Sequence, residues 1–186
     1  MRKSITLPLR ASLFCLGLLC GPLLAAEPTE LFNADGYRQG QYRSPTPASV
    51  EGAETVDTPA LQQLLRDEPQ VVLIDVFRQQ WLNERFIADR PAHTNLPGSA
   101  WLANTGDGSL EPRWQTYFED NLARLSEQRK ERPLVFYCKS DCWLSWNAIK
   151  RARTLGYTRL YWYRDGTDAW QQAGMSLVPA EPVPMP

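Results

Sequence analysis

The feature that most constrains this chain is an alternation of short apolar runs with segments of helical periodicity. Continuous apolar runs end at Asp75 and Tyr137, and a third covers 160–163. Runs of this kind are typical of strands buried on both faces of a parallel sheet. Apolar spacing predicts helices in four segments, one starting at 58 and the others covering 114–128, 145–155 and 168–173. The alternation therefore predicts an α/β fold with a mainly parallel sheet flanked by helices on both faces.

Composition and charge narrow the possible functions. Hydrophobic residues make up 43% and charged residues 22% of the 186 residues, which is the balance of a globular chain. The formal net charge of −1 leaves no basic field to attract nucleic acid or an anionic membrane. The single histidine, His93, excludes a histidine-rich metal site and is expected in a loop. We therefore expect no nucleic-acid partner and no metal site built on histidine.

The first 26 residues have the composition of a secretory signal peptide. Basic residues at the start are followed by an apolar run over 11–24 and by the small residues Ala25 and Ala26. The run is shorter than the about 20 apolar residues of a transmembrane helix, so an uncleaved anchor is the less favoured alternative. The sequence predicts export to the bacterial periplasm, removal of residues 1–26 by cleavage, and no membrane attachment afterwards.

Three further segments follow the predicted signal peptide. Residues 27–56 are rich in Gly, Pro, Ser and Thr and are expected to form an extended N-terminal arm with little regular structure. The periodic segments place the α/β domain at 57–178. The last residues, 179–186, hold four prolines and are expected to form a flexible tail.

The cysteines indicate reactivity rather than a structural role. Cys15 and Cys20 leave with the signal peptide, so the mature chain keeps Cys138 and Cys142. Close thiols tend to pair in an oxidising compartment, yet a disulfide that closes so short a loop adds little global stability. Two cysteines that only pack in the core are the alternative. Cys138 and Cys142 are therefore the candidate catalytic residues.

The candidate cysteines follow a predicted strand and precede a predicted helix. This geometry aims backbone N–H groups and the positive helix end at Cys138, which favours the nucleophilic thiolate. On a regular helix, Cβ atoms four residues apart are separated by about 5–6 Å, whereas a disulfide needs about 3.5–4.5 Å. Pairing with Cys142 therefore requires Cys138 to lie on the loop. A disulfide in so tight a loop is expected to be strained and readily reduced.

Four neighbours complete the candidate active loop. Lys139 adds a positive charge, Asp141 opposes it, and Ser140 and Trp143 lie beside the cysteines in the sequence. Asp75 also ends a strand run, so it is expected at the same edge of the sheet. We predict that Asp75 either orients the loop or accepts hydrogen bonds at the end of its strand, the second role being the commoner one.

Four segments resemble the rhodanese-like domain family, in matching order and spacing over about 56–178. The first two are Leu73-Ile74-Asp75-Val76 and Asn95-Leu96-Pro97-Gly98-Ser99-Ala100. The third runs from Tyr137-Cys138 through the predicted helix to Leu155-Gly156-Tyr157, and the fourth is 163–170. The resemblance implies a rhodanese-like fold. It also implies that Cys138 lies in the active loop of a rhodanese-type sulfurtransferase.

A narrower set of motifs resembles a bacterial group, the PQQ-dependent catabolism-associated CXXCW-motif proteins. The set comprises arm motifs at 36–38 and 42–47, the loop at 138–143, where three residues separate the cysteines, and 161–168. The resemblance implies an association with periplasmic alcohol oxidation by pyrroloquinoline quinone enzymes. It implies a pathway rather than a reaction.

Departures from the rhodanese pattern affect the anion site. Asp141 and Trp143 stand near the places of the glycine and arginine that cradle an anionic sulfur donor, and Cys142 is additional. Phe77 occupies the place where an arginine often follows the strand aspartate, and Arg78 is expected to substitute as a supporting residue. Because an acidic side chain in an anion cradle weakens thiosulfate binding, ordinary thiosulfate transfer is disfavoured.

Three functions remain open at this point. In the first, Cys138 attacks a sulfane or disulfide sulfur and forms a persulfide or mixed disulfide, which Cys142 resolves. In the second, the two thiolates hold copper(I), which prefers sulfur ligands. In the third, the protein is a non-catalytic partner of a periplasmic quinoprotein. We favour the first, in which a thiol protein without a firmly bound cofactor acts on a small sulfur-containing substrate or a periplasmic redox partner.

Overall fold

A five-stranded sheet lies at the centre of the computed structural model, which describes residues 30–185. Its strands are arranged in the order β1-β8-β7-β2-β6, and every neighbouring pair is parallel. The bounds are β1 Glu54–Val56, β8 Leu160–Tyr163, β7 Leu134–Tyr137, β2 Val72–Asp75 and β6 Ala100–Trp101. The predicted signal peptide, 1–26, lies outside the described residues.

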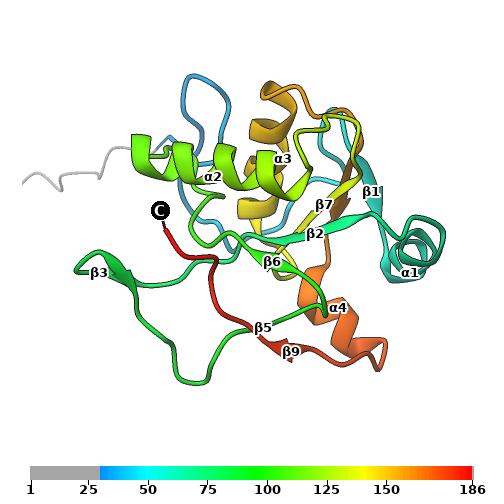
Figure 1. Ribbon diagram of the computed structural model, residues 1–186. Coiled ribbons are helices and arrows are strands. Elements are labelled where there is room, and N and C mark those ends of the chain that lie inside the picture. Colours follow the sequence, from blue (N-terminus) through cyan, green and yellow to red (C-terminus); the bar gives the residue numbers. More distant parts are fainter. Residues whose placement is uncertain (1–29, 186) are drawn as a thin grey trace, which may run out of the picture.

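Helices cover both faces of the sheet, as Figure 1 shows. The helices α2 (Pro112–Leu125) and α3 (Trp143–Thr154) lie on one face, and α1 (Thr58–Asp67) and α4 (Gly166–Gln172) lie on the other. Two apolar cores match this division, because alternate residues of each strand point to opposite faces. The predicted α/β fold with a mainly parallel sheet is therefore confirmed.

The central strand β7 shows why continuous apolar runs predicted buried strands. All four of its residues are buried, with Leu134 and Phe136 in the core under α2 and α3 and Val135 and Tyr137 in the other core. Because β7 is covered on both faces, none of its side chains is open to solvent. The candidate reactive residue Cys138 lies directly beyond its end.

Two small antiparallel pairs flank the main sheet. The first joins β3 (Trp81–Leu82) to β4 (Arg85–Phe86). The second joins β5 (Thr94–Asn95) to β9 (Val178–Pro179) and so begins the C-terminal segment.

The C-terminal segment, whose prolines predicted a flexible tail, makes several contacts with the rest of the fold. The Val183 amide donates to Trp101 O at 2.9 Å, and the Tyr117 hydroxyl donates to Val183 O at 2.7 Å. Val183 and Met185 also pack against the core under α2 and α3. Proline removes only the donor of a peptide unit, so the carbonyl groups and the non-proline amide still anchor the segment.

The N-terminal arm, drawn in blue in Figure 1, runs beside α3 with little regular structure. Only isolated bridges interrupt its irregular course before β1, whose three residues end the predicted arm and join the sheet. The arm is fixed to α3 by polar contacts. The Arg38 amide donates to Asn147 Oδ1 at 2.9 Å, and Lys150 Nζ donates to Gly36 O at 2.7 Å. Within residues 30–185, no helix is both long and apolar enough to span a bilayer.

Candidate functional site

Cys138 directly follows β7, at the carboxyl edge of the sheet. Asp75 ends the neighbouring strand β2, where it pairs in register with Tyr137. The structure therefore places Asp75 and Cys138 at the same edge, as the strand ends predicted.

Cys138 and Cys142 are joined in a disulfide, with their Cα atoms 6.4 Å apart. Cys142 is the N-cap residue of α3, so Cys138 lies on the loop and the second cysteine at the helix start. The loop between them reverses at Asp141, whose φ of +49° lies in the left-handed region that aspartate tolerates better than most residues. Each cysteine is only 1% exposed.

The loop is held from the C-terminal side by α4 and the turn before it. Ser140 N donates to Asp168 Oδ2 at 3.0 Å, and Ser140 Oγ donates to Asp165 O at 2.8 Å. The Thr167 amide donates to Cys138 O at 3.0 Å. Gly166 is required here, because its φ is +53° and an added Cβ would lie 2.2 Å from that carbonyl oxygen.

The N-terminal arm covers the disulfide from the other side. Arg43 pairs antiparallel with Cys142. The Trp143 amide donates to Tyr42 O at 2.9 Å, and Ser44 N donates to Asp141 O at 3.1 Å. This coverage was not predicted, since an irregular segment carries no periodicity that would show where it packs. The first amide of α3 therefore donates to the arm rather than to a sulfur.

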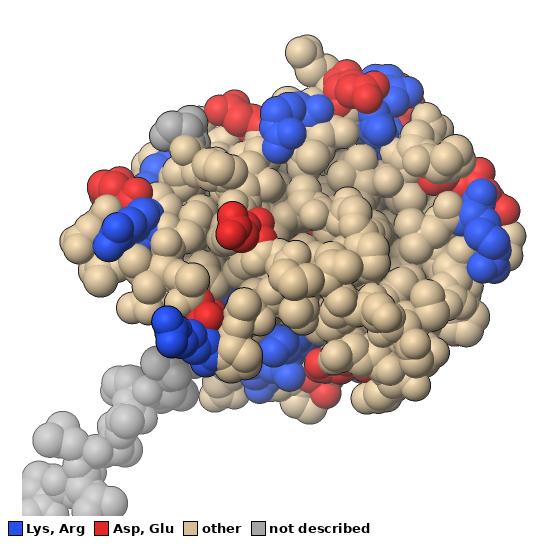
Figure 2. All heavy atoms as spheres, turned by 60° about the horizontal axis from the view of Figure 1, so that its bottom comes forward, with Lys and Arg blue, Asp and Glu red and all other residues tan. Residues whose placement is uncertain are grey.

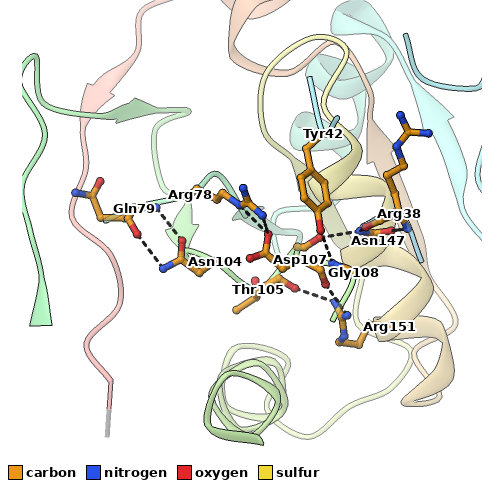
Figure 3. A network of polar contacts seen from close by, with 11 residues as sticks. Arg38, Tyr42, Arg78, Gln79, Asn104, Thr105, Asp107, Gly108, Asn147 and Arg151 are labelled. Carbon is orange, nitrogen blue, oxygen red and sulfur yellow. Dashed lines mark hydrogen bonds and ion pairs between the residues drawn. The ribbon is translucent and has the colours of Figure 1, made fainter. Parts of the chain in front are cut away.

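A polar network anchors the arm, and Figure 3 shows it from close by. The Tyr42 hydroxyl accepts from the Gly108 amide at 2.9 Å, and the Arg78 guanidinium lies 4.4 Å from the Tyr42 ring centroid. Arg78 also forms an ion pair with Asp107. Arg151, in turn, donates to Asp107 O at 2.8 Å. The arm, the β2–β3 connection and α3 are thus tied together at one place.

Burial dominates the electrostatics of this network. It raises the pKa of Asp107 even though Arg78 opposes the shift, and it lowers the pKa of Arg151. It also raises the pKa of Tyr42. The contacts that hold the arm therefore join a buried arginine, Arg151, to the partly exposed Tyr42 and Asp107.

Arg78, predicted as a supporting residue of the loop, contacts the arm network. Its guanidinium pairs with Asp107 and lies over the Tyr42 ring. The position after the strand aspartate determines where its backbone lies, whereas Asp107 determines where its side chain points.

Asp75 is fully buried and has two partners. Its Oδ1 accepts from the Phe77 amide at 2.9 Å, and its Oδ2 lies 2.6 Å from His93 Nε2. Asp75 thus makes the contacts of a hydrogen-bond acceptor at the end of its strand. The histidine was predicted only as a loop residue, and nothing in the sequence marked it as the partner of Asp75.

The other loop residues contact neighbouring parts of the protein. Lys139 lies with its Nζ 4.8 Å from the Phe77 ring centroid. Asp141 Oδ1 accepts from the Thr46 amide at 3.3 Å. Trp143 is 8% exposed, and the Arg38 guanidinium lies over its ring, with Arg38 Cζ 4.8 Å from the ring centroid. These contacts place Asp141 and Trp143 in the interface between the loop and the arm.

The disulfide lies between the start of α3 and the core under α2 and α3. The positive end of the 12-residue helix α3 begins next to Cys142, and its dipole stabilises negative charge there. Ser145 Oγ lies 4.0 Å from Cys138 Sγ and within the same buried region. Among the described residues, no group of three or more His, Cys, Asp or Glu side chains could hold a metal ion.

The fold and the site together define an α/β protein with a cysteine at the tip of a central parallel strand. The sequence matches the rhodanese-like domain family over residues 57–173, and the protein belongs to that family. A comparison with curated proteins finds no match.

Several solved structures are similar in fold. One is a thiosulfate sulfurtransferase from Pseudomonas aeruginosa, with 15% identity and a TM-score of 0.46. Another is a polysulfide-sulfur transferase homodimer from Wolinella succinogenes, with 19% identity and a TM-score of 0.46. A 3-mercaptopyruvate sulfotransferase from Escherichia coli has 19% identity and a TM-score of 0.49. The matches cover 72%, 70% and 72% of this chain. They cover 22%, 81% and 54% of those proteins, so the chain spans about a fifth of the first.

Proposed function

We propose that this protein is a periplasmic thiol–disulfide oxidoreductase in which Cys138 and Cys142 cycle between disulfide and dithiol. The observation that carries the proposal is the bond between the two cysteines at the tip of β7, beside the start of α3. A disulfide across so few residues constrains the unfolded chain only weakly, so a purely structural purpose explains it poorly. A local pair suits redox chemistry, because the second thiol can resolve a mixed disulfide on the first within the same loop.

The reaction balances without a cofactor. The Cys138 thiolate attacks a sulfur of a partner disulfide, forming a mixed disulfide and releasing the other partner sulfur as a thiolate. The Cys142 thiolate then attacks Cys138 Sγ, which forms the internal disulfide and releases the second partner thiolate. Two electrons pass from the cysteine pair to the partner. The reverse sequence oxidises a partner dithiol and leaves the pair reduced.

Two features favour disulfide exchange over sulfur transfer from an anionic donor. The sulfur that would carry a persulfide is bonded to Cys142. Asp141 lies on the same loop, and its carboxylate opposes the approach of an anion. Arg164 Nη2 lies 4.0 Å from Asp141 Oδ1, but it also donates to Thr46 O of the arm at 3.3 Å.

Access to the sulfurs requires movement of the arm. Both cysteines are 1% exposed, and the backbone of residues 42–44 pairs with residues 141–143. Local opening of an irregular segment costs less free energy than global unfolding. The proposed cycle therefore includes a step in which the arm leaves the loop and a partner reaches the pair.

The cellular setting is part of the proposal. The composition of residues 1–26 supports export, and export would place the pair in a compartment where disulfides persist. The motifs shared with the PQQ-associated group support a redox or quinoprotein partner in periplasmic alcohol catabolism. N-terminal sequencing of protein from a periplasmic extract should find a start near Glu27, whereas a start at Met1 would contradict export with cleavage.

Trapping of the mixed disulfide tests the chemistry. Reduced Cys142→Ser protein, incubated with oxidised glutathione, should retain one glutathione on Cys138, because the resolving thiol is missing. The matched Cys138→Ser variant keeps only Cys142, so the faster of the two variants identifies the attacking thiol, which the proposal assigns to Cys138. Equal and slow modification of both variants would contradict the proposal.

Intact mass spectrometry of the purified wild-type protein separates the alternatives. A mass about 2 Da below that of the reduced chain supports the disulfide. A gain of one sulfur atom would support a rhodanese-type persulfide on Cys138 instead. A retained copper ion that is lost in both cysteine variants would support the copper(I)-binding alternative.

A further inference from the structure

A cavity of about 490 Å³ lies away from the disulfide, between the β3–β4 hairpin and the C-terminal segment. Neither cysteine lines it. Figure 2 shows this side of the molecule, where charged side chains lie mostly around the margin of the face. The volume falls within the about 300–1,000 Å³ typical of small-molecule sites.

Aromatic side chains form the walls of the cavity. Trp81 and Phe86 project from the two strands of the hairpin, with ring centroids 4.8 Å apart, and Trp101 lies on the side of the main sheet. Pro182 and Met185 of the C-terminal segment close the opposite side. Rigid aromatic walls suit a flat apolar molecule, which can stack on them or meet them edge to face.

One polar group in the wall is held in a defined orientation. His93 Nε2 lies 2.6 Å from the fully buried Asp75, while the imidazole stacks on Phe77 with the ring planes 7° apart. The ring also packs on Trp101, with the ring centroids 4.1 Å apart and the planes tilted by 36°. The side chain is 8% exposed, so only a ring edge is open to the cavity.

The free ring nitrogen of His93 defines the polar preference of the cavity. With Asp75 as a carboxylate, which can only accept, Nε2 is the donor of this pair. In the neutral ring the other nitrogen, Nδ1, is then an acceptor, and within residues 30–185 it has no hydrogen-bond partner. A ligand that donates one hydrogen bond would satisfy it.

The charges near the cavity disfavour an anion. Glu84 is paired with Arg113 at 3.2 Å. The remaining charged lining residues are Asp89 and Glu181 against Arg85, which leaves an excess of negative charge. An uncharged ligand avoids both this repulsion and the cost of removing a charge from water.

We propose that this cavity binds an uncharged, planar aromatic alcohol or phenol whose hydroxyl donates to Nδ1 of His93. Binding requires no redox change and does not depend on the cysteine pair. It would give the protein a small-molecule site in addition to the thiol chemistry proposed above.

The single histidine makes the proposal directly testable by nuclear magnetic resonance. Mature protein carrying ¹⁵N-labelled histidine is titrated with phenol, with anisole, which lacks the donor, and with benzoate. Phenol should shift the Nδ1 resonance of His93 in a saturable way, with a dissociation constant of about 1 mM as expected for so small a ligand. Anisole and benzoate should bind at least about fivefold more weakly, because the first makes no hydrogen bond and the second is charged.

Two variants keep the outcome unambiguous. Trp81→Ala removes a cavity wall at the hairpin and should weaken phenol binding at least about fivefold. Trp146→Ala removes an indole that does not line this cavity and should leave binding unchanged. A linear, non-saturating response to phenol, equal binding of phenol and anisole, or an unchanged affinity in Trp81→Ala would each overturn the proposal.

Discussion

Replacement of Tyr42 by alanine should accelerate reduction of the buried disulfide. The side chain accepts one hydrogen bond from Gly108, lies under the Arg78 guanidinium and packs half-buried against the core that contains both cysteines. The hydrogen bond contributes about 1 kcal/mol, the cation–π contact about 0.5–1 kcal/mol and burial of part of the ring about 1–2 kcal/mol. A loss of about 3 kcal/mol increases the population of the open arm about 100-fold.

The rate of reduction by dithiothreitol measures this population, because reduction requires opening when the reductant cannot reach the closed form. Quenched samples are alkylated and counted by mass. Tyr42→Ala should be reduced about 100-fold faster than the wild type, and Tyr42→Phe, which loses only the hydroxyl, about fivefold faster. Circular dichroism checks that all three proteins remain folded. Rates within twofold of one another in folded proteins would refute the covering role of the arm.

Two further predictions concern stability. Gly98→Ala should lower the free energy of unfolding by about 1–2 kcal/mol, because a φ of +80° is strained for alanine while the surroundings are open. Gly166→Ala should lower it by at least about 3 kcal/mol and disturb the cysteine loop, because the added Cβ would also meet Cys138 O. Denaturant titration of both variants checks this, and equal losses would contradict the close approach to Cys138 O. Burial raises the pKa of Tyr117, so the unfolded chain loses this proton at a lower pH than the folded one. Stability should therefore fall as the pH rises above about 10, and a Tyr117→Phe variant that shows an undiminished fall would contradict it.

The sequence predicted the features that depend on strand ends. The continuous apolar runs before Asp75 and Cys138 predicted that both lie at the ends of strands of one parallel sheet, and this edge is where the structure has them. The loop–helix transition likewise placed Cys142 within bonding distance of Cys138. These predictions rest on local patterns whose spatial meaning is almost independent of the rest of the chain.

Features that depend on contacts distant in sequence were not predictable in the same way. The arm is held to the loop by backbone hydrogen bonds between residues about 100 positions apart, and any residue could supply those groups. Arg78 follows its strand as expected, yet its direction is set by Asp107. His93 meets Asp75 only because the long connection after β2 returns to the sheet edge.

A redox titration tests the central claim, that Cys138 and Cys142 form a reversible redox pair. The protein is equilibrated in glutathione buffers of graded potential, quenched with acid, alkylated and weighed. We predict a single two-electron transition between species with zero and two alkylated thiols, at a potential between about −270 and −120 mV, the range of known thiol–disulfide oxidoreductases. A pair that stays oxidised in every glutathione buffer, or thiols that never pair, would contradict it.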